Sequence, residues 1–477
     1  MRHPFVPTCA ALCSAALLTA CGHLAPQRAA TAATGYLSHQ LCSYVFVAGL
    51  EAERAYREAI EPLASGLPLR YAVDRERGEV RATLAGMAPG RAVFRPPYGC
   101  VNATGTATGI APTAAAMPSA AATPAAAATL VTPALLPPIA GRQLVAPASP
   151  ALARAVDMAF AESPEPPHRN THAVVVVQAG RIVAERYAPG IGVNTPLPGW
   201  SATKSALNAL LGILVQQGRL DIHAPAPIAE WADPADPRHA VTPDQLLRMT
   251  SGLSLGQSLD SPGPFNPAVQ MLFVEPDMVA FAAAAPLAHA PGTHWAYTDP
   301  NSLLLSRIVR NAAGGNAERT LAFMRRELFD KLGMRSVTLE FGAAGTPVGA
   351  SHLWAPARDW ARLGLLYLND GVVGGERLLP PGWVEYSARP TAGSEVYGYA
   401  AGFWTNRGDG SGARYRINAG MPADAFMARG AQGQYVVIVP SRQLVIVRMG
   451  PAWTPRDDMA VVARLTRDVI DALAPLH

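Results

Sequence analysis

An uncharged stretch rich in Ala, Pro and Thr divides the chain into two unequal parts. Residues 104–138 contain no Asp, Glu, Lys or Arg, and prolines recur among the alanines and threonines. Proline cannot donate a backbone N–H and disrupts helices, so a stretch of this kind favours neither a helix nor a packed core. We therefore predict a semi-extended linker over residues 104–149, between a small module at 35–103 and a large domain at 150–477.

The N-terminal residues are typical of an export signal. Arg2 is followed by a run of small and apolar residues that is too short to span a bilayer. The run ends in Leu18-Thr-Ala-Cys-Gly22, which resembles a bacterial lipobox. That resemblance implies a signal peptide over 1–20, a lipid on Cys21 and a flexible tether over 21–34, with the protein anchored to a membrane of the bacterial cell envelope. An ordinary cleaved signal without a lipid is the alternative.

The cysteine positions agree with export. Cys9 and Cys13 would leave with the signal and Cys21 would carry the lipid, so Cys42 and Cys100 remain as a pair. An even pair in an oxidising compartment favours a disulfide. Two buried thiols are the alternative.

The charge pattern gives no support to a nucleic-acid partner. The formal net charge is +4, and the basic residues are scattered without a dense run. Apolar residues make up 49% of the chain, which is enough for a large core. No His-x-His-x-Asp set occurs in the sequence, so we expect no catalytic metal.

The apolar pattern of the large domain predicts an α/β arrangement. Two short strands separated by a turn are expected near its beginning, and a second such hairpin is expected near the end of the chain. Helical patterns fill the space between them, so the two terminal segments should meet in one sheet. The expected strands are 172–178, 181–187, 434–439 and 443–449, and two of the expected helices are 201–217 and 457–472.

One of only two lysines in the chain stands in a catalytic pattern. Lys204 lies three residues after Ser201, whereas positive charge elsewhere is met almost entirely by Arg. Arg stays protonated in proteins, but a buried Lys can lose its proton and act as a base. Residues three apart share one helix face, so Lys204 can reach the Ser201 hydroxyl at the positive end of the helix dipole. This arrangement predicts Ser201 as an acyl-enzyme nucleophile and Lys204 as its base. A helix cap and a surface Lys are the alternative.

A second proton-handling group is expected further along the chain. Tyr297 lies in His294-Trp-Ala-Tyr-Thr-Asp-Pro-Asn301, and a Tyr close to a lysine ammonium can act as a general base. Acyl transfer also needs backbone N–H donors for the oxyanion. Ser201 N–H is one donor, and the second is expected from the segment that leads into the strand at Gln434.

Taken in order, these motifs resemble the serine β-lactamase and penicillin-binding-protein superfamily, in its class C-like branch with 6-aminohexanoate-dimer hydrolases and related esterases. The motifs are Ser201-Ala-Thr-Lys204, Tyr297-Thr-Asp299 and Gly430-Ala-Gln-Gly-Gln-Tyr435. The resemblance implies a β-lactamase/transpeptidase-like fold, with an antiparallel sheet flanked by helices and an all-helical region. It also implies catalysis by Ser201, Lys204 and Tyr297 without a cofactor.

Two departures from the family pattern bear on the substrate. The second motif usually ends in Asn, and here Asp299 stands there, with Asn301 two residues further on. The third motif usually contains Lys or His, and aligning Gly433 leaves no cation in that place unless Arg429 reaches round. In that alignment the second oxyanion donor is the N–H of Ala428. The remaining residues expected to bind substrate are Trp295 and Gly430.

We therefore expect a hydrolase that cleaves a small or peptide-like ester or amide lacking the carboxylate anchor of a β-lactam. A β-lactamase or DD-peptidase proper and a catalytically silent envelope-binding module are the alternatives. A Gly-x-Ser-x-Gly match at Gly252–Gly256 is disfavoured, because that motif needs a strand before it and a helix after it.

Overall fold

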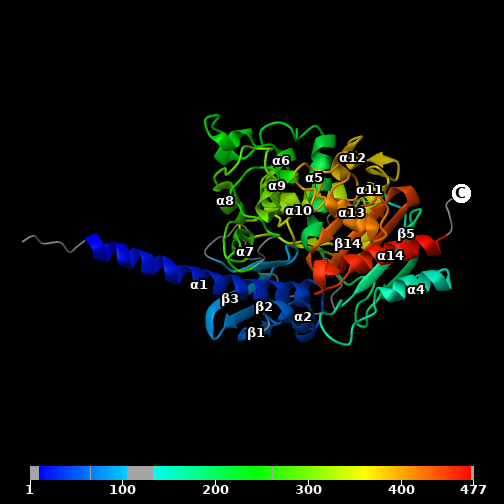
Figure 1. Cartoon of the computed structure of the whole chain (residues 1–477), viewed down its shortest axis with the longest axis horizontal. Helices are drawn as coiled ribbons and strands as arrows, with labels where there is room; N and C mark the ends of the chain where they lie inside the picture. The colour runs from blue at the N-terminus through cyan, green and yellow to red at the C-terminus, as the bar shows by residue number, and fades with distance from the viewer. Residues whose placement is uncertain (1–9, 65, 105–132, 260–262, 474–477) are drawn as a thin grey trace, which may run out of the picture.

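The computed structural model describes residues 10–64, 66–104, 133–259 and 263–473. The first part of the expected signal peptide, with Arg2 and Cys9, lies outside these ranges, as does most of the expected linker, residues 105–132. Four antiparallel sheets and many helices make up the described part of the chain (Figure 1).

A six-stranded antiparallel sheet forms the centre of the large domain. Its order is β12-β13-β14-β15-β5-β6, so the strands from the two ends of the domain pair with each other, as the sequence predicts. Side chains along each strand alternate between the two faces; in β14, Val436 and Ile438 enter one core cluster while Val437 and Val439 enter the other. The strands are β5 (Ala173–Gln178), β6 (Arg181–Tyr187), β12 (Trp404–Thr405), β13 (Phe426–Gly430), β14 (Gln434–Val439) and β15 (Leu444–Met449).

Helices cover both faces of this sheet. On one face, α4 (Pro150–Met158) and α14 (Met459–Ala472) pack side by side, as Figure 1 shows at the lower right. On the other face, α11 (Ala357–Leu368) lies across β14, β15 and β5, with α5 (Thr203–Gln216) beyond it in the same core. The whole of α5 up to Leu214 is buried, as expected for a helix that is apolar on most sides.

A helical region adjoins α5. It is centred on α9 (Asp299–Ala312), which contacts α5, α6, α8 and α10. The remaining helices here are α6 (Pro243–Leu247), α7 (Pro267–Phe273), α8 (Met278–Ala283) and α10 (Ala317–Met324), and α12 (Trp383–Ala388) and α13 (Ser411–Asn418) lie nearer the sheet. Two small sheets complete the domain: β7 (Leu197–Pro198), β9 (Leu353–Ala355) and β8 (Thr338–Leu339), and the pair β10 (Val372–Val373) and β11 (Glu376–Arg377).

The N-terminal module is a long helix on a four-stranded sheet. Helix α1 (Ala10–Cys42) packs across β2 and β3, and its N-terminal half projects beyond the body of the molecule (Figure 1). A disulfide joins Cys42 at the end of α1 to Cys100 in the last strand. The other elements are α2 (Ala52–Ala59), α3 (Glu61–Ala64), β1 (Leu69–Asp74), β2 (Glu79–Leu84), β3 (Met87–Phe94) and β4 (Cys100–Asn102).

Residues 21–34, expected to be a flexible tether, lie within α1. Alanine has the highest helix propensity, so an Ala-rich segment readily extends a neighbouring helix. From Ala29 onward the segment also packs, since Ala29, Ala32 and Thr34 are buried. Small residues permit this close approach: a Cβ on Gly35 would lie 2.4 Å from the Phe273 carbonyl oxygen of α7. The folded module therefore begins before residue 35.

The part of the expected linker that the structure describes, residues 133–149, packs against the domain. Ile139 is buried and accepts a hydrogen bond from Ile182 N–H at 2.9 Å. Val145 N–H donates to the Glu185 carboxylate at 2.8 Å. Because β6 is an edge strand, its free backbone groups favour pairing with an adjacent segment, and the apolar residues of 133–149 supply one.

Within the described residues, no helix has the length and apolarity needed to cross a membrane.

The Gly252–Gly256 match is not a nucleophile elbow. Leu253 forms only an isolated bridge with Leu287. Within the described segment 133–259, the last strand before it is β7, which ends at Pro198, so no strand leads into the motif.

The disulfide should contribute measurably to stability. It closes a loop with a sequence separation of 58 residues, for which loop-closure entropy corresponds to roughly 4 kcal/mol at most and about 2–4 kcal/mol in practice. We expect Cys42→Ser/Cys100→Ser to lower the free energy of unfolding by about that amount, measured by chemical denaturation. Reductant should destabilise the wild-type protein and leave the double variant unchanged; equal sensitivity of the two would contradict the prediction.

Candidate active site

The segment that carries Ser201 is held in place by the small sheet. Gly199 N–H donates to the Leu353 carbonyl at 2.8 Å, and Leu353 N–H donates to the Thr203 hydroxyl at 3.1 Å. Ser201 lies in a 3-10 turn, Trp200–Ala202, that leads directly into α5. Trp200 has a φ of 46°, a left-handed conformation that costs energy for a non-glycine residue and is often found at functional sites. Ser201 is thereby partly exposed at the N-terminus of a buried helix.

Lys204 is buried, and all three hydrogens of its ammonium have acceptors. The side chain is 2% exposed. Nζ lies 3.1 Å from Ser201 Oγ, 2.5 Å from Asp299 Oδ1 and 2.8 Å from the Ala350 carbonyl oxygen. An ammonium has three donors and no acceptor, so this environment matches the protonated form of the side chain. The predicted contact between Lys204 and Ser201 is present.

The protonation of Lys204 differs from the sequence-based expectation. Burial by itself lowers the pKa of the Lys204 ammonium, as expected. The charge of Asp299, and the hydrogen bonds of the ammonium with Asp299 and Tyr297, act in the opposite direction, and the pKa of Lys204 lies above its usual value. A buried lysine paired with a carboxylate keeps its proton, so Lys204 is a cation in the resting site rather than a free base.

Tyr297 lies beside Lys204, as the motif order predicts. Its side chain is 3% exposed, and Lys204 Nζ stands 5.0 Å from the centre of its ring. The ring is fixed by edge contact with Tyr399 and by Trp404. Aromatic rings attract a cation above their face, so Tyr297 adds to the stabilisation of the charged Lys204 and has little freedom to turn away.

Asp299, and not Asn301, faces Lys204. Asp299 begins α9 and its carboxylate is the partner of the Lys204 ammonium. Asn301 is 1% exposed, and its side-chain oxygen accepts a hydrogen bond from the Ser251 hydroxyl at 3.0 Å. Because Asn301 is held in the core by Ser251 and lies against Met249, it does not replace the Asn of the usual second motif.

The N–H of Ala428 is not placed to bind an oxyanion. Asn406 N–H donates to the Ala425 carbonyl, which sets the backbone groups of Ala425 toward the β12 side. Backbone groups alternate in an antiparallel strand, so those of Ala428 point the other way, toward Val436 in β14. The prediction of Ala428 as a donor is therefore wrong, because the alignment on Gly433 shifted the strand out of register.

The N–H of Ala431, unlike that of Ala428, points away from β14. By the same alternation, its N–H points toward the free edge of β13 beyond the end of β12. Gly430 lies against the nucleophile segment, where a Cβ would stand 2.0 Å from the Gly199 carbonyl oxygen. The N–H groups of Ser201 and Ala431 are therefore the two candidates for oxyanion donors.

The other predicted substrate residues have structural contacts. Trp295 is buried and packs against Tyr397 and Tyr399. Arg429 donates to the Tyr435 hydroxyl at 3.0 Å, and its guanidinium lies 4.9 Å from the centre of the Trp404 ring. These contacts hold Arg429 along the sheet.

Three residues near Ser201 were not found from the sequence. The Ala350 carbonyl binds Lys204. Tyr36, from the N-terminal module, stacks on Trp200 with ring centres 6.2 Å apart, and Gln432 accepts a hydrogen bond from Trp200 Nε1 at 3.1 Å. Ala350 and Tyr36 belong to no motif, and Gln432 lies in the third motif without a predicted role. The contact of Tyr36 depends on how the module docks, which has no local signal in the sequence.

Comparison with known proteins assigns the family. Residues 156–470, more than half of the chain, match the Beta-lactamase family. The chain belongs to this family of β-lactamase-fold hydrolases, which confirms the resemblance seen in the motifs.

Two individual relatives are similar to large parts of this chain. An uncharacterized protein of Mycobacterium tuberculosis is 31% identical over 264 residues, which cover 44% of this chain and 64% of that protein. The chain thus spans just under two thirds of the length of this relative. A 6-aminohexanoate-dimer hydrolase of Paenarthrobacter ureafaciens is 25% identical over 309 residues, covering 60% of this chain and 74% of the relative.

A solved structure supports the fold. The structure of a putative 6-aminohexanoate-dimer hydrolase from Bacillus anthracis has a TM-score of 0.53 and 21% identity, covering 72% of this chain and 89% of that one. The predicted β-lactamase/transpeptidase-like fold is therefore confirmed.

Replacing Asp299 by Asn should change the pH at which Lys204 loses its proton. Without the carboxylate, burial becomes the main influence, so the pKa of Lys204 falls. If hydrolysis needs Lys204 as a cation, Asp299→Asn should shift the alkaline limb of the pH profile of kcat/KM for a p-nitrophenyl ester to lower pH. The exposed Asp157→Asn serves as the control and should leave the limb in place. An unchanged or upward-shifted limb in Asp299→Asn would show that Asp299 does not hold the Lys204 proton.

Proposed function

We propose that this protein is an exported serine hydrolase that cleaves an ester or amide through an acyl-enzyme on Ser201. The observation that carries the proposal is the buried Lys204, whose ammonium binds Ser201, Asp299 and Ala350 at once. A structural lysine has no need of a partly exposed serine as one of three partners. The neighbouring Tyr297 supplies a second proton-handling group.

The first half of the reaction forms the acyl-enzyme. Ser201 Oγ attacks the substrate carbonyl carbon, and the N–H groups of Ser201 and Ala431 bind the oxygen as it becomes negative. The serine proton passes to the Lys204–Tyr297 pair. Because Asp299 keeps Lys204 charged, Tyr297 must act as a phenolate beside the ammonium, and this phenolate takes the serine proton and then gives it to the leaving alcohol or amine.

The second half of the reaction frees the serine. Water attacks the acyl carbonyl and loses its proton to Tyr297, and that proton returns to Ser201 Oγ as the acid leaves. Lys204 keeps a positive charge beside these transfers. Tyr297 later donates each proton that it accepts, so the protonation state of the site is the same at the end of the cycle as at the start.

Two features favour a substrate without a β-lactam-type carboxylate. The second motif presents the carboxylate of Asp299, which accepts hydrogen bonds and cannot donate an amide N–H. The cation of the usual third motif is absent from its place, and Arg429 is engaged with Tyr435 and Trp404. The 25% identical 6-aminohexanoate-dimer hydrolase has a name that denotes cleavage of a linear dimer of amino acids, which suits this site.

Intact-mass spectrometry tests the nucleophile. The purified protein is mixed with a p-nitrophenyl short-chain ester, with 6-aminohexanoate dimer and, separately, with a penicillin. We expect ester or dimer turnover, with an acyl adduct that is absent in Ser201→Ala, and a loss of at least about 10³-fold in kcat for that variant. Ser205→Ala, which alters a buried serine one turn away, is the control and should keep the adduct.

The other outcomes of this experiment point to the alternatives. An adduct with penicillin alone would identify a cell-wall peptidase, a β-lactamase or a sensor of β-lactams. An absence of adduct and turnover with every acyl donor would overturn the hydrolase proposal in favour of a silent envelope-binding module.

We further propose that Cys21 carries a lipid that anchors the protein in the cell envelope. The support is the lipobox-like sequence Leu18–Gly22. In a bacterial host, Cys21→Ser should move the protein from the membrane fraction to the soluble fraction and abolish incorporation of a labelled fatty acid. Cys13→Ser, which alters a cysteine of the signal run, should change neither. Continued labelling of Cys21→Ser would contradict the assignment.

A further inference from the structure

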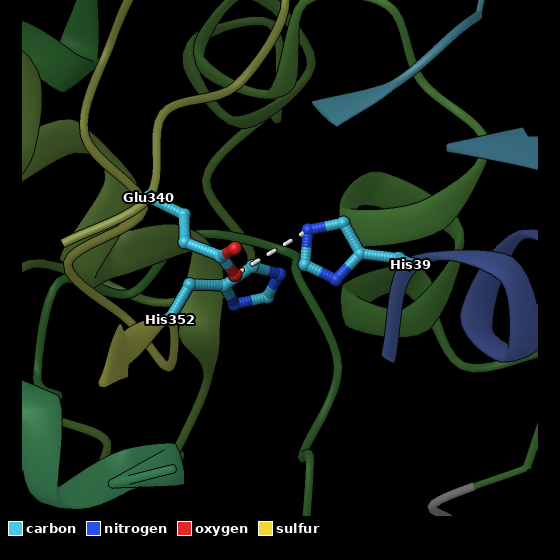
Figure 2. Close-up of side chains that lie close together, drawn as sticks. All are labelled: His39, Glu340 and His352. Atoms are coloured by element: carbon cyan, nitrogen blue, oxygen red, sulfur yellow. Dashed lines mark ion pairs between the residues drawn. The ribbon is translucent and has the colours of Figure 1, made fainter. Parts of the chain in front are cut away.

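Three ionisable side chains meet between the N-terminal module and the domain, away from the Ser201 hydroxyl. His39 comes from α1, Glu340 directly follows β8, and His352 directly precedes β9. All three are buried. Figure 2 shows the His39 ring pointing at the Glu340 carboxylate from the module side, with the His352 ring beside that carboxylate. One ligand-type atom from each residue lies within 4.8 Å of the others.

The Glu340 carboxyl group accepts three hydrogen bonds and has no permanently charged cation beside it among the described residues. Its Oε1 accepts hydrogen bonds from Ser43 Oγ at 2.8 Å and Cys100 N–H at 2.7 Å, and its Oε2 accepts one from Trp354 Nε1 at 3.2 Å. Burial raises the pKa of Glu340 to about 8, although these three donors lower it. Among the described residues, His39 is the one basic side chain that pairs with Glu340. A buried carboxylate is costly unless a cation compensates it.

The two histidines have ring nitrogens available in the same place. His352 Nδ1 is 2.6 Å from Ser351 Oγ, while its Nε2 is buried and makes no hydrogen bond with the described residues. The rings of His39 and His352 are 4.5 Å apart between centres. Burial lowers the pKa of both. A neutral imidazole whose second nitrogen is fixed, as in His352, is the usual state of a histidine that binds a metal.

The separation of His39 Nε2 from Glu340 Oε2 suits two ligands of a tetrahedral ion. His39 Nε2 lies 3.6 Å from Glu340 Oε2 and 3.1 Å from the Cys100 carbonyl oxygen. Zn²⁺ binds nitrogen and oxygen at about 2.0–2.2 Å, so neighbouring ligands in a tetrahedron are about 3.3–3.6 Å apart. A donor set of two imidazoles and one carboxylate is common for zinc.

We propose that His39 Nε2, His352 Nε2 and Glu340 Oε2 bind a structural Zn²⁺ ion that joins the N-terminal module to the domain. The Cys100 carbonyl oxygen is the fourth donor. Zinc on Nε2 places the His39 proton on Nδ1, which is buried without a partner, and His39 lines a cavity together with Asn102, whose Oδ1 is likewise unpartnered within the described residues. The ion supplies the charge that Glu340 lacks, and the proposed hydrolysis at Ser201 does not use it.

The position of this site links the module to the nucleophile. His352 belongs to the segment Ala350–Leu353, whose backbone binds Lys204 at one end and both Gly199 and Thr203 at the other. An ion on His352 therefore fixes the segment that positions the catalytic lysine, and it does so through His39 of a separate module.

Zinc binding to the untagged full-length protein tests the proposal. After removal of metal with EDTA, the protein is titrated with Zn²⁺ by calorimetry, and metal content is measured by mass spectrometry. We expect one Zn²⁺ per chain and a rise in Tm of about 3 °C or more at saturating zinc. His39→Gln and His352→Asn keep the hydrogen-bonding positions at Nε2 and Nδ1, respectively, and should weaken zinc binding by at least about 100-fold.

A matched control comes from another contact across the same boundary. His172 Nε2 pairs with Glu58 Oε2 at 2.8 Å, again between domain and module, but without a second histidine. Glu58→Gln should leave zinc affinity unchanged. If His352→Asn fails to fold, His39→Gln and the effect of zinc on wild-type Tm still decide the question. A wild-type protein that binds no zinc would overturn the proposal. So would zinc affinity as high as that of the wild type in both histidine variants, as expected if the exposed His289–His294 pair were the site.

Discussion

The burial of one ammonium group, that of Lys204, determines how several segments of this molecule are placed. Lys204 cannot be taken out of water unless its three N–H donors find acceptors. The acceptors come from three distant segments: the turn that holds Ser201, the first residue of α9 and the loop before β9. The hydrogen bonds of this one side chain therefore fix Ser201, the helical region and the small sheet relative to one another. The same contacts bring Tyr297 over the ammonium, so the catalytic arrangement and the packing of the domain have a common cause.

Much of the fold could be predicted because its signals are local. The hairpins β5–β6 and β14–β15 follow from runs of branched apolar residues around short turns, and α5 follows from an apolar run that ends before Gly218. Ser201, Lys204 and Tyr297 could be singled out for the same reason, since each stands in a short motif. Their meeting in space was implied by the order of the motifs. The Cys42–Cys100 disulfide followed from counting cysteines.

The errors arose where a contact between distant segments decides the structure. Pairing with β14 turns the Ala428 N–H away from Ser201, and a shift of register is invisible in the sequence of β13 alone. Residues 21–34 look flexible in composition, but α7 and β3 pack against their small side chains. The charge state of Lys204 depends on Asp299, ninety-five positions away. Burial alone predicts a lowered pKa, and the carboxylate reverses it.

The pairing of β5 with β15 has a consequence for how the chain acquires its structure. β5 begins at residue 173 and its partner at residue 444, so the central sheet stays incomplete until nearly all of the chain has been synthesised. The contacts of the N-terminal module are also completed late in synthesis, because the Glu58 carbonyl accepts a hydrogen bond from Trp453 Nε1. Folding dominated by such distant contacts is slow, because loop closure precedes the energy gained from pairing. A nascent chain with these connections therefore remains without its central sheet for most of its synthesis.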